Sequence, residues 1–580
     1  MKLLYRLDIK LTLLGPILTR GSIGPPGIDA AVARDAAGQV MLPFSLVKGK
    51  VLDALKELFP TDPRIGQWLG SPSSEGSYDP DRGRLHFSDF ATTQNGCAED
   101  KVIERIELDD ATGSTTERML AMIESPFAYG EEVVFTGNVE FAADPREADT
   151  IRNMIEQALR WVPAFGAMRS VGFGRTKNVE VKLVKCVERC SGVPTNGERL
   201  RVRLKLDRPF CVGGRNHALN HFDSLRTLSG AVLKGACARL LLERCGRSGV
   251  AVDNSLPAPW DQMGSVFDVI RFSEARPANL DGPRPIEPPL SQVLGEKGGT
   301  RHDVALWSEP RLINGNAPAF DIDWKREDFE RCRKDFHWPD VSTERRTRTA
   351  INEETGRAKD EQLFSYGLIR PGDLVWLGEI DLVEVPQQQR GEIRKRLQEL
   401  LTFGLPGIGK TNATASIEWL PAEKMEPVQK RDNHVITLQT EALLTDPGTL
   451  TGPDQLEAAY REYWAEVSKK SLKLVRFFAR QELRGGKFLG RSSASSKYEP
   501  FLVTSRGSVF VLERTGHGDP LEHLSYWREH GLPVANWVAN RYSGSGPLWR
   551  RCPFLPHVGY GEVLIDHKCH FESLSNEAQK

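Results

Sequence analysis

The sequence predicts an α+β fold in which ferredoxin-like (RRM-like) units, each with a split βαβ order and an antiparallel sheet, follow one another along the chain. Glycine-rich loops indicate this repeat, because a similar arrangement of glycines returns about 235 residues later. The first loop runs from Phe165 to Thr176 and the second from Phe403 to Thr411. A matched helix start is the second indication, since a Lys-Gly pair opens an apolar helical pattern at Lys48 and again at Lys234.

The elements of each unit are expected in one order: strand, loop, helix, hairpin-rich middle, strand, helix, glycine loop, strand. The first strands alternate apolar and polar residues, which is typical of a sheet with one buried face. The expected first strands are Tyr5–Leu13, Leu200–Leu206 and Val435–Leu443, the later strands Val133–Phe141 and Val375–Leu382, and the helices before the glycine loops Ile155–Trp161 and Ile393–Leu401. A reduced third loop, Gly559–Glu562, precedes the last strand.

Polar stretches with proline or glycine divide the chain into three units. The breaks at 191–197 and 421–433 give units at 1–190, 198–425 and 434–580. The second unit carries a long insertion, residues 246–342, which is rich in proline near its middle. The third unit has no Lys-Gly helix start, and we expect it to be an interaction or capping module.

Composition describes a globular chain of 580 residues with a formal net charge of −1, which by itself does not indicate a nucleic-acid partner. The absence of a long apolar run argues against a membrane span, and nine cysteines without framework spacing suit a reducing cytoplasm. Neither Cys186 with Cys190 nor the cluster His567–His570 has the paired spacing of a zinc site, so free thiols are expected. Between Ser468 and Lys497, basic residues alternate with aromatic ones, a pattern that suits stacking on unpaired bases.

A glycine-rich loop that carries a cation predicts a backbone that approaches a polyanion, and a Lys-Gly helix start supplies amides and an ammonium group suited to phosphate. Both features alternatively suit turn glycines and solvated lysines. The candidate phosphate-binding residues are Lys48, Gly49, Arg169, Gly172, Gly174, Arg175, Lys234, Gly235, Gly407, Gly409 and Lys410.

The second loop also matches a nucleotide-binding pattern, because Gly404 to Thr411 fits G-x-x-x-x-G-K-[ST] at every position. That motif needs a strand before it and a helix after it. Here a helical pattern precedes the loop and a strand pattern follows it. We therefore disfavour a nucleoside-triphosphate site.

Three motifs in order give the chain a resemblance to a known family, the RAMP superfamily of CRISPR systems. They are Ile28-Asp29 through Arg34-Asp35, then Leu42-Pro43 through Lys48-Gly49-Lys50, then the terminal glycine loop. The first unit is similar to the backbone subunit of type III effector complexes, and the arrangement of units resembles the fused subunits of the type III-D branch. The resemblance implies tandem RAMP domains that bind CRISPR guide RNA and complementary target RNA beside other effector subunits. It also implies thumb-like hairpins, expected near 101–124 and 343–364.

In the subunits that this resemblance names, the aspartate matching Asp29 carries target-RNA cleavage. A loop carboxylate beside a phosphodiester can hold Mg²⁺, which stabilises charge developing on oxygen. The alternative is that Asp29 only forms a turn. The second unit departs from the pattern, since it has no matching aspartate. Its residues His217, His221 and Asp223 suit either a structural polar loop or, in a guide-RNA-processing endoribonuclease of the same superfamily, a histidine base.

Overall fold

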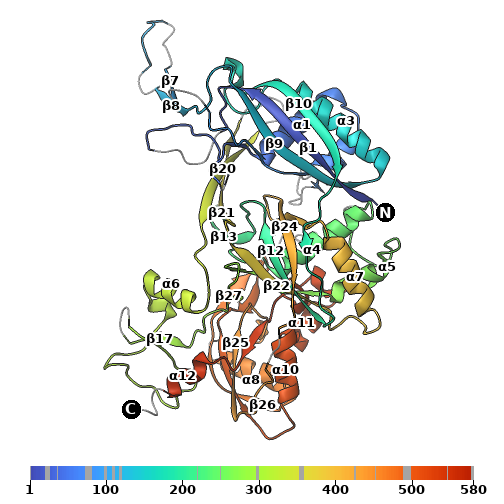
Figure 1. The fold of residues 1–580 in the computed structure, drawn as a ribbon. Helices are drawn as coiled ribbons and strands as arrows, with labels where there is room; N and C mark the ends of the chain where they lie inside the picture. The colour runs from blue at the N-terminus through green and yellow to red at the C-terminus, as the bar shows by residue number, and fades with distance from the viewer. Residues whose placement is uncertain are drawn as a thin grey trace.

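The computed structural model describes residues 2–19, 26–35, 37–71, 81–96, 101–106, 111–116, 120–218, 220–247, 250–295, 299–351, 358–423, 426–450, 452, 454–486, 498–544 and 547–575. Three sheets with their helices form an elongated stack, with the first unit at one end and the third at the other (Figure 1). In these ranges, no helix is both long and apolar enough to cross a membrane.

The first unit has the ferredoxin-like strand order, in which the first strand lies between the third and the last. β1 (Leu3–Leu14) pairs antiparallel with β9 (Glu132–Ala143) and with β10 (Arg175–Lys185). The alternating apolar residues of β1 form one buried core with α1 (Phe44–Leu58) and α3 (Pro145–Trp161). Shorter elements complete the unit: β2 (Met41–Leu42), α2 (Arg64–Leu69), β3 (Gly70–Ser71), β4 (Asp81–Arg82), β5 (His86–Phe87) and β6 (Phe90–Ala91).

The second unit repeats this order. β12 (Arg199–Leu206) lies between β22 (Val375–Asp381) and β24 (Ala413–Leu420), both antiparallel to it. Its core includes α4 (Gly230–Arg244) and α7 (Arg390–Leu401). Short strands extend the sheet: β11 (Cys190–Ser191), β15 (Arg271–Phe272), β16 (Arg276–Ala278) and β23 (Leu405–Ile408).

The third unit has the same order again. β25 (Asn433–Leu438) lies between β29 (Val509–Arg514) and β30 (Val563–Ile565), and β26 (Leu472–Phe478) pairs with β29. The helices are α8 (Gln455–Val467), α10 (Leu521–His530) and α11 (Asn536–Arg541), and β27 (Gln481–Arg484) pairs with β28 (Phe501–Thr504). The predicted α+β class with ferredoxin-like antiparallel sheets is therefore confirmed.

The insertion of the second unit packs against the third unit. Ala305 joins Val435, Val509 and Val511 in one buried cluster, so the insertion covers apolar residues of the third sheet. Figure 1 places its helix α6 and strand β17 beside the C-terminal helix α12. The insertion contains α5 (Asp261–Val266), β17 (Gln292–Leu294), β18 (Arg301–Asp303), β19 (Ala319–Phe320) and α6 (Arg326–Asp335). Helix α12 (Cys569–Ser575) belongs to the C-terminal segment.

Two hairpins lie where the thumb-like segments were expected. β7 (Val102–Arg105) and β8 (Ala121–Glu124) project from the first unit. β20 (Thr343–Ile351) and β21 (Ala358–Ile369) run from the second unit towards the first (Figure 1). Strands β20 and β21 share a sheet with β13 (Gly213–Ala218) and β14 (His221–Ser224). Because β13 and β14 pair antiparallel, the loop that carries His217, His221 and Asp223 is a hairpin.

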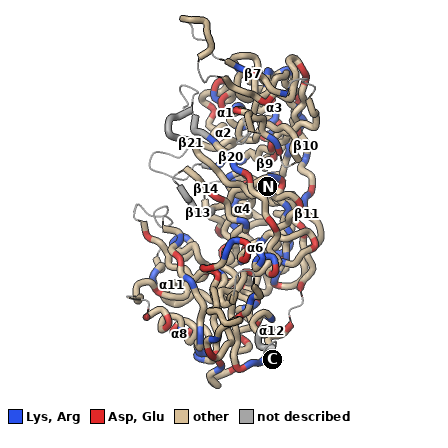
Figure 2. The backbone as a smooth tube through the Cα atoms, turned by 90° about the vertical axis from the view of Figure 1, so that its left-hand side faces the viewer, with Lys and Arg blue, Asp and Glu red and all other residues tan. Residues whose placement is uncertain are grey.

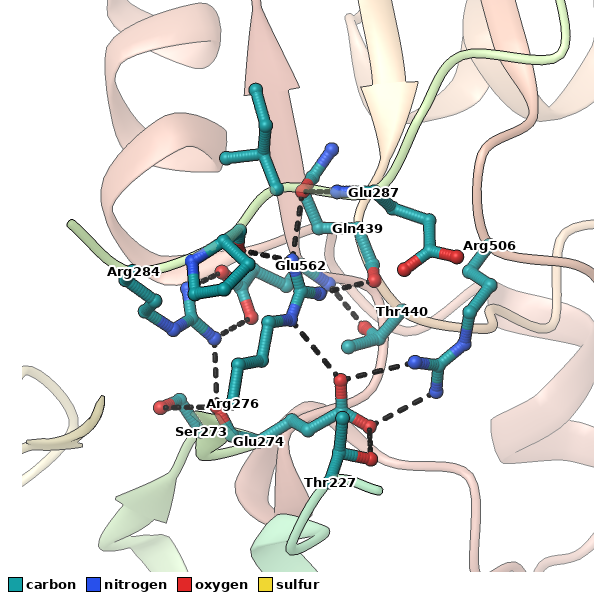
Figure 3. A network of polar contacts seen from close by, with 12 residues as sticks. Thr227, Ser273, Glu274, Arg276, Arg284, Glu287, Gln439, Thr440, Arg506 and Glu562 are labelled. Carbon is teal, nitrogen blue, oxygen red and sulfur yellow. Dashed lines mark hydrogen bonds and ion pairs between the residues drawn. The ribbon is translucent and has the colours of Figure 1, made fainter. Parts of the chain in front are cut away.

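A buried polar network joins the second unit to the third (Figure 3). The Arg276 side chain is 0% exposed, and its guanidinium donates to Glu274 Oε1 (3.2 Å) and to Gln439 Oε1 (3.0 Å). Arg506 donates to both Glu274 and Glu441, at 2.9 and 3.0 Å. Because charges in such a place must be paired, these contacts fix how the two units dock.

Candidate nucleic-acid interface

Asp29 lies on a loop that pairs with the base of hairpin β7–β8. Its backbone N–H donates to the Met122 carbonyl (2.9 Å), and its Oδ2 accepts from the Met122 N–H (2.7 Å). Glu124 holds the same loop by accepting from the Val32 N–H (2.9 Å). The Asp29 side chain is still exposed to solvent. The carboxylate is therefore fixed in place and open to a partner.

Arg105 connects the Asp29 loop with the first glycine loop. It lies on β7 beside the residue that pairs with Met122, and its guanidinium is 3.5 Å from Met168 Sδ. Met168 immediately precedes Arg169 in the glycine loop. The predicted catalytic residue and the first predicted RNA-binding loop thus meet at the base of one hairpin.

Arg169 and Arg175 are both exposed. Neither forms a hydrogen bond or ion pair through its side chain with another residue that the structure describes. Unpaired guanidinium groups are suited to phosphate, because they offer several donors and a permanent charge. Together with Asp29 and Arg105, we call these residues the hairpin-base surface.

Lys48 lies half-buried on α1, where the first unit meets the second. Burial and, second, the charge of Arg239 on α4 hold the pKa of the Lys48 ammonium below its usual range. Arg239 lies against the second glycine loop, since a Cβ added to Gly407 would come within 3.3 Å of its Nη1. That Nη1 is buried without a hydrogen-bond partner. Arg239 is already paired with Glu243, whose Oε1 accepts from its Nε at 2.8 Å, whereas Lys48 makes no ion pair with a described residue.

Lys410 packs against two aromatic rings of the adjoining four-stranded sheet. Its Nζ is 3.8 Å from the ring centroid of Phe222 and 4.8 Å from that of Tyr366. Arg348, on β20, lies over Tyr366 and also over Phe44 of the first unit, at 5.9 and 5.7 Å. We call this group the inter-unit surface, and its members are Lys48, Phe222, Arg239, Arg348, Tyr366 and Lys410.

Lys234 needs a correction, because the structure argues against a phosphate contact there. The side chain is buried, and its Nζ donates to the carbonyls of Asp268 (2.7 Å) and Ile270 (2.8 Å). Burial lowers the pKa of this ammonium to about 8. Lys234 therefore ties α4 to the segment that follows α5, and its charge is turned away from solvent.

One amide at each of the two helix starts already has a side-chain partner within the protein. The Phe44 N–H at the start of α1 donates to Asp89 Oδ1 (2.7 Å). At the start of α4, the Ser229 side chain accepts from the Val232 N–H (3.4 Å). These amides are satisfied without phosphate. Gly49 and Gly235 lie on these helices, where a Cβ would meet nothing within 4 Å.

The loop glycines Gly174 and Gly409 serve close packing within the protein. Gly174 has φ +61°, and an added Cβ would lie 2.0 Å from the carbonyl oxygen of Phe165. Gly409 has φ +67°, with the Cys211 carbonyl 2.5 Å from that position. The repeated glycines therefore reflect the approach of each loop to its own chain. Gly172, by contrast, has open space around it.

Several cations on the sheet faces are paired with neighbouring carboxylates. Arg6 pairs with Asp8 (2.7 Å), and Arg203 with Glu418 (2.7 Å). The basic run before Lys497 behaves similarly, since Arg480 pairs with Asp321 (2.9 Å) of the insertion. Residues 487–497 of that run lie outside the described part. Lys and Arg are spread among Asp and Glu along the whole molecule (Figure 2).

The nucleotide-binding pattern, Gly404 to Thr411, lies between a helix and a strand, which is the reverse of the order that such a motif needs. Helix α7 precedes Gly404, and strand β24 follows Thr411. The Thr411 side chain is 2% exposed, and its Oγ1 has no hydrogen-bond partner. A hydroxyl in that position cannot reach a metal ion on a bound nucleotide.

The second-unit polar residues lie on the β13–β14 hairpin. His221 Nε2 is 3.1 Å from Asp223 Oδ1, which is an orienting contact of the kind that a histidine base uses. His217 is on β13, but its side chain lies outside the described atoms. The role of this pair stays a prediction.

Asp29 could hold the predicted Mg²⁺ only as a single protein ligand. Among the described residues, no group of three or more potential ligands includes it. Mg²⁺ retains several waters and is commonly held by one or two carboxylates together with substrate phosphates. An exposed carboxylate such as Asp29 satisfies that requirement when RNA supplies the other oxygens.

One protein-family model matches the first unit. Residues 10–177 match the family model described as "RAMP superfamily". A chain of a type III-B Cmr-beta complex, bound to cognate target RNA and AMPPnP, is 11% identical with a TM-score of 0.33, covering 63% of this chain and 96% of that one. A chain of a Cmr-beta complex bound to cognate target RNA is 16% identical with a TM-score of 0.23, covering 31% and 60%. No curated protein matches. Residues 10–177 of this chain are a RAMP-superfamily domain.

Proposed function

We propose that this chain is an RNA-binding subunit of a type III CRISPR effector complex. We also propose that its first unit cleaves target RNA, with Asp29 as the catalytic residue. Its partners are the guide RNA, the complementary target RNA and other effector subunits. The observation that carries the proposal is the position of Asp29, exposed at the base of hairpin β7–β8 within the RAMP domain.

Guide RNA in this proposal crosses the hairpin-base surface and the inter-unit surface. Arg169 and Arg175 bind phosphates without rearranging other contacts, since neither has a protein partner among the described residues. At the inter-unit surface, Lys48 attracts phosphate, because it has no ion-pair partner among the described residues. The rings of Phe222 and Tyr366 add an aromatic platform next to Lys410.

Cleavage in this proposal depends on the orientation of Asp29. Its Oδ2 is held by the Met122 N–H, which leaves Oδ1 to face the RNA. A Mg²⁺ ion held by Asp29 and RNA phosphates would supply electrostatic stabilisation of the charge that develops during phosphodiester cleavage. Hairpin β7–β8 positions the target RNA beside the Asp29 carboxylate, and the glycine loop with Arg169 and Arg175 holds the adjoining phosphates.

The test is cleavage of guide-complementary RNA by the assembled complex carrying Asp29→Ala. We expect cleavage at one position to fall by about 100-fold or more, because a single charge-stabilising group commonly contributes that much. Target binding should stay at the wild-type level. The matched control is Asp35→Ala, since Asp35 Oδ1 only closes its turn by accepting from the N–H groups of Ala37 (2.9 Å) and Gln39 (2.8 Å).

Wild-type cleavage by Asp29→Ala would contradict the catalytic assignment. Cleavage that resists chelation and disappears only in His221→Ala would favour the guide-processing alternative, because the His221–Asp223 pair can act without a metal.

A further inference from the structure

A cluster of metal-binding residue types lies between the insertion and the C-terminal helix, away from the hairpin-base surface and the inter-unit surface. Asp303 closes β18, and Cys569 and His570 begin α12. One ligand atom from each of these three residues lies within 4.8 Å of the other two. In the described part of the chain, this is the one group of three or more such residues with that geometry.

His570 and Asp303 lie within ion-pair distance of each other. His570 Nδ1 lies 3.0 Å from Asp303 Oδ2, yet this nitrogen has no hydrogen-bond partner. Both side chains are almost fully buried, with His570 1% and Asp303 2% exposed. An unsatisfied nitrogen beside a carboxylate in such a place is costly. A cation that both atoms can bind would remove that cost.

The surrounding contacts hold the side chains of His570 and Asp303 in place. His570 Nε2 lies 3.0 Å from Thr437 Oγ1, and a hydrogen bond from Nε2–H to that oxygen leaves the lone pair on Nδ1. Asp303 is held by Ser291 (2.9 Å) and by Gln292 (2.7 Å). These partners restrict the carboxylate and the imidazole to one orientation each.

Cysteine, histidine and aspartate together are the donor types of zinc sites. Two anionic ligands would balance the charge of Zn²⁺, which suits a buried location. His567 lies beside Cys569, since its Nδ1 is 3.0 Å from Cys569 Sγ. Since the ligands come from both the insertion and the C-terminus, a metal would cross-link two segments more than 260 residues apart in sequence (569 − 303 = 266).

We propose that Asp303, Cys569 and His570 bind one structural Zn²⁺ ion that fastens helix α12 to the insertion. This differs from the free thiols expected from the spacing of His567–His570. The spacing was uninformative because Asp303 is contributed by a distant segment.

The test measures metal in the full-length chain purified after expression with added zinc. We expect about one zinc per chain in the wild type. Cys569→Ser and Asp303→Asn should lose it. The matched control is Cys332→Ala, because Cys332 is a buried thiol in the cluster that Cys569 packs against but is not one of the three ligands. This variant should retain the metal.

Thermal unfolding with a chelator provides a second readout. The melting temperature of the wild type should fall on chelation and recover with Zn²⁺, whereas that of Cys569→Ser should not respond. Should the ligand variants fail to fold, Co²⁺ added to the chelated wild type should produce a thiolate-to-metal charge-transfer band. A wild type without zinc and without that band would overturn the proposal, as would loss of zinc in Cys332→Ala alone.

Discussion

Lys48 and Lys234 occupy the same position of two repeated helix starts, yet their surroundings are opposite. Lys48 is half-buried beside another cation and binds no described residue, whereas Lys234 is buried and donates to two backbone carbonyls. The insertion explains the difference, because it supplies the carbonyls of Asp268 and Ile270. A sequence repeat therefore preserves the fold of a position without preserving its exposure.

The largest expected effect concerns stability. Lys234→Met should lower the free energy of unfolding by about 2–3 kcal/mol, because two buried carbonyls lose their donor. Lys48→Met should change it by no more than about 0.5 kcal/mol, since no described contact is removed. Denaturant unfolding of both variants checks this contrast. Equal losses would show that the two lysines have the same structural role.

A pH series should sharpen the contrast. The pKa of Lys234 is lowered by burial to about 8 in the folded chain, against an ordinary value of 10.5. Between these values the unfolded chain binds the proton more strongly, so the stability of the wild type relative to Lys234→Met should rise with pH. We expect a gain of about 1–2 kcal/mol between pH 8 and about 9.5. A flat difference would mean that Lys234 does not titrate in this range.

The smallest expected effect concerns RNA. Lys48→Met and Arg175→Gln should each weaken RNA retention by roughly threefold to tenfold and reduce the salt dependence by about one phosphate contact. Lys234→Met should leave the affinity per folded molecule unchanged. Filter binding over a range of salt concentrations measures both quantities. Loss of affinity in Lys234→Met at constant folded fraction would contradict the structural role assigned to that residue.

Local patterns predicted the fold well because they reflect local physics. The alternation of Leu7, Ile9 and Leu11 gives β1 its buried face, and the apolar spacing after Lys48 gives α1 its packing side. The strand order could follow from the repeat and the resemblance. The elements therefore needed little tertiary information.

The candidate site was less predictable because its contacts join distant segments. Arg239 is an ordinary polar residue of a helix in the sequence, and only the docking of two units places it between Lys48 and Gly407. Gly174 and Gly409 have conspicuous spacing, yet the spacing alone cannot tell whether a backbone approaches phosphate or its own carbonyls. Burial of Lys234 depended on an insertion with no counterpart in the first unit.

The network around Arg276 limits how far this chain can be divided. Excising the third unit at the 421–433 stretch would remove Gln439, Glu441 and Arg506, and Glu274 and Arg276 would become exposed at a cut surface. The second and third units therefore share one polar network, and we expect that they must be kept together in any engineered fragment.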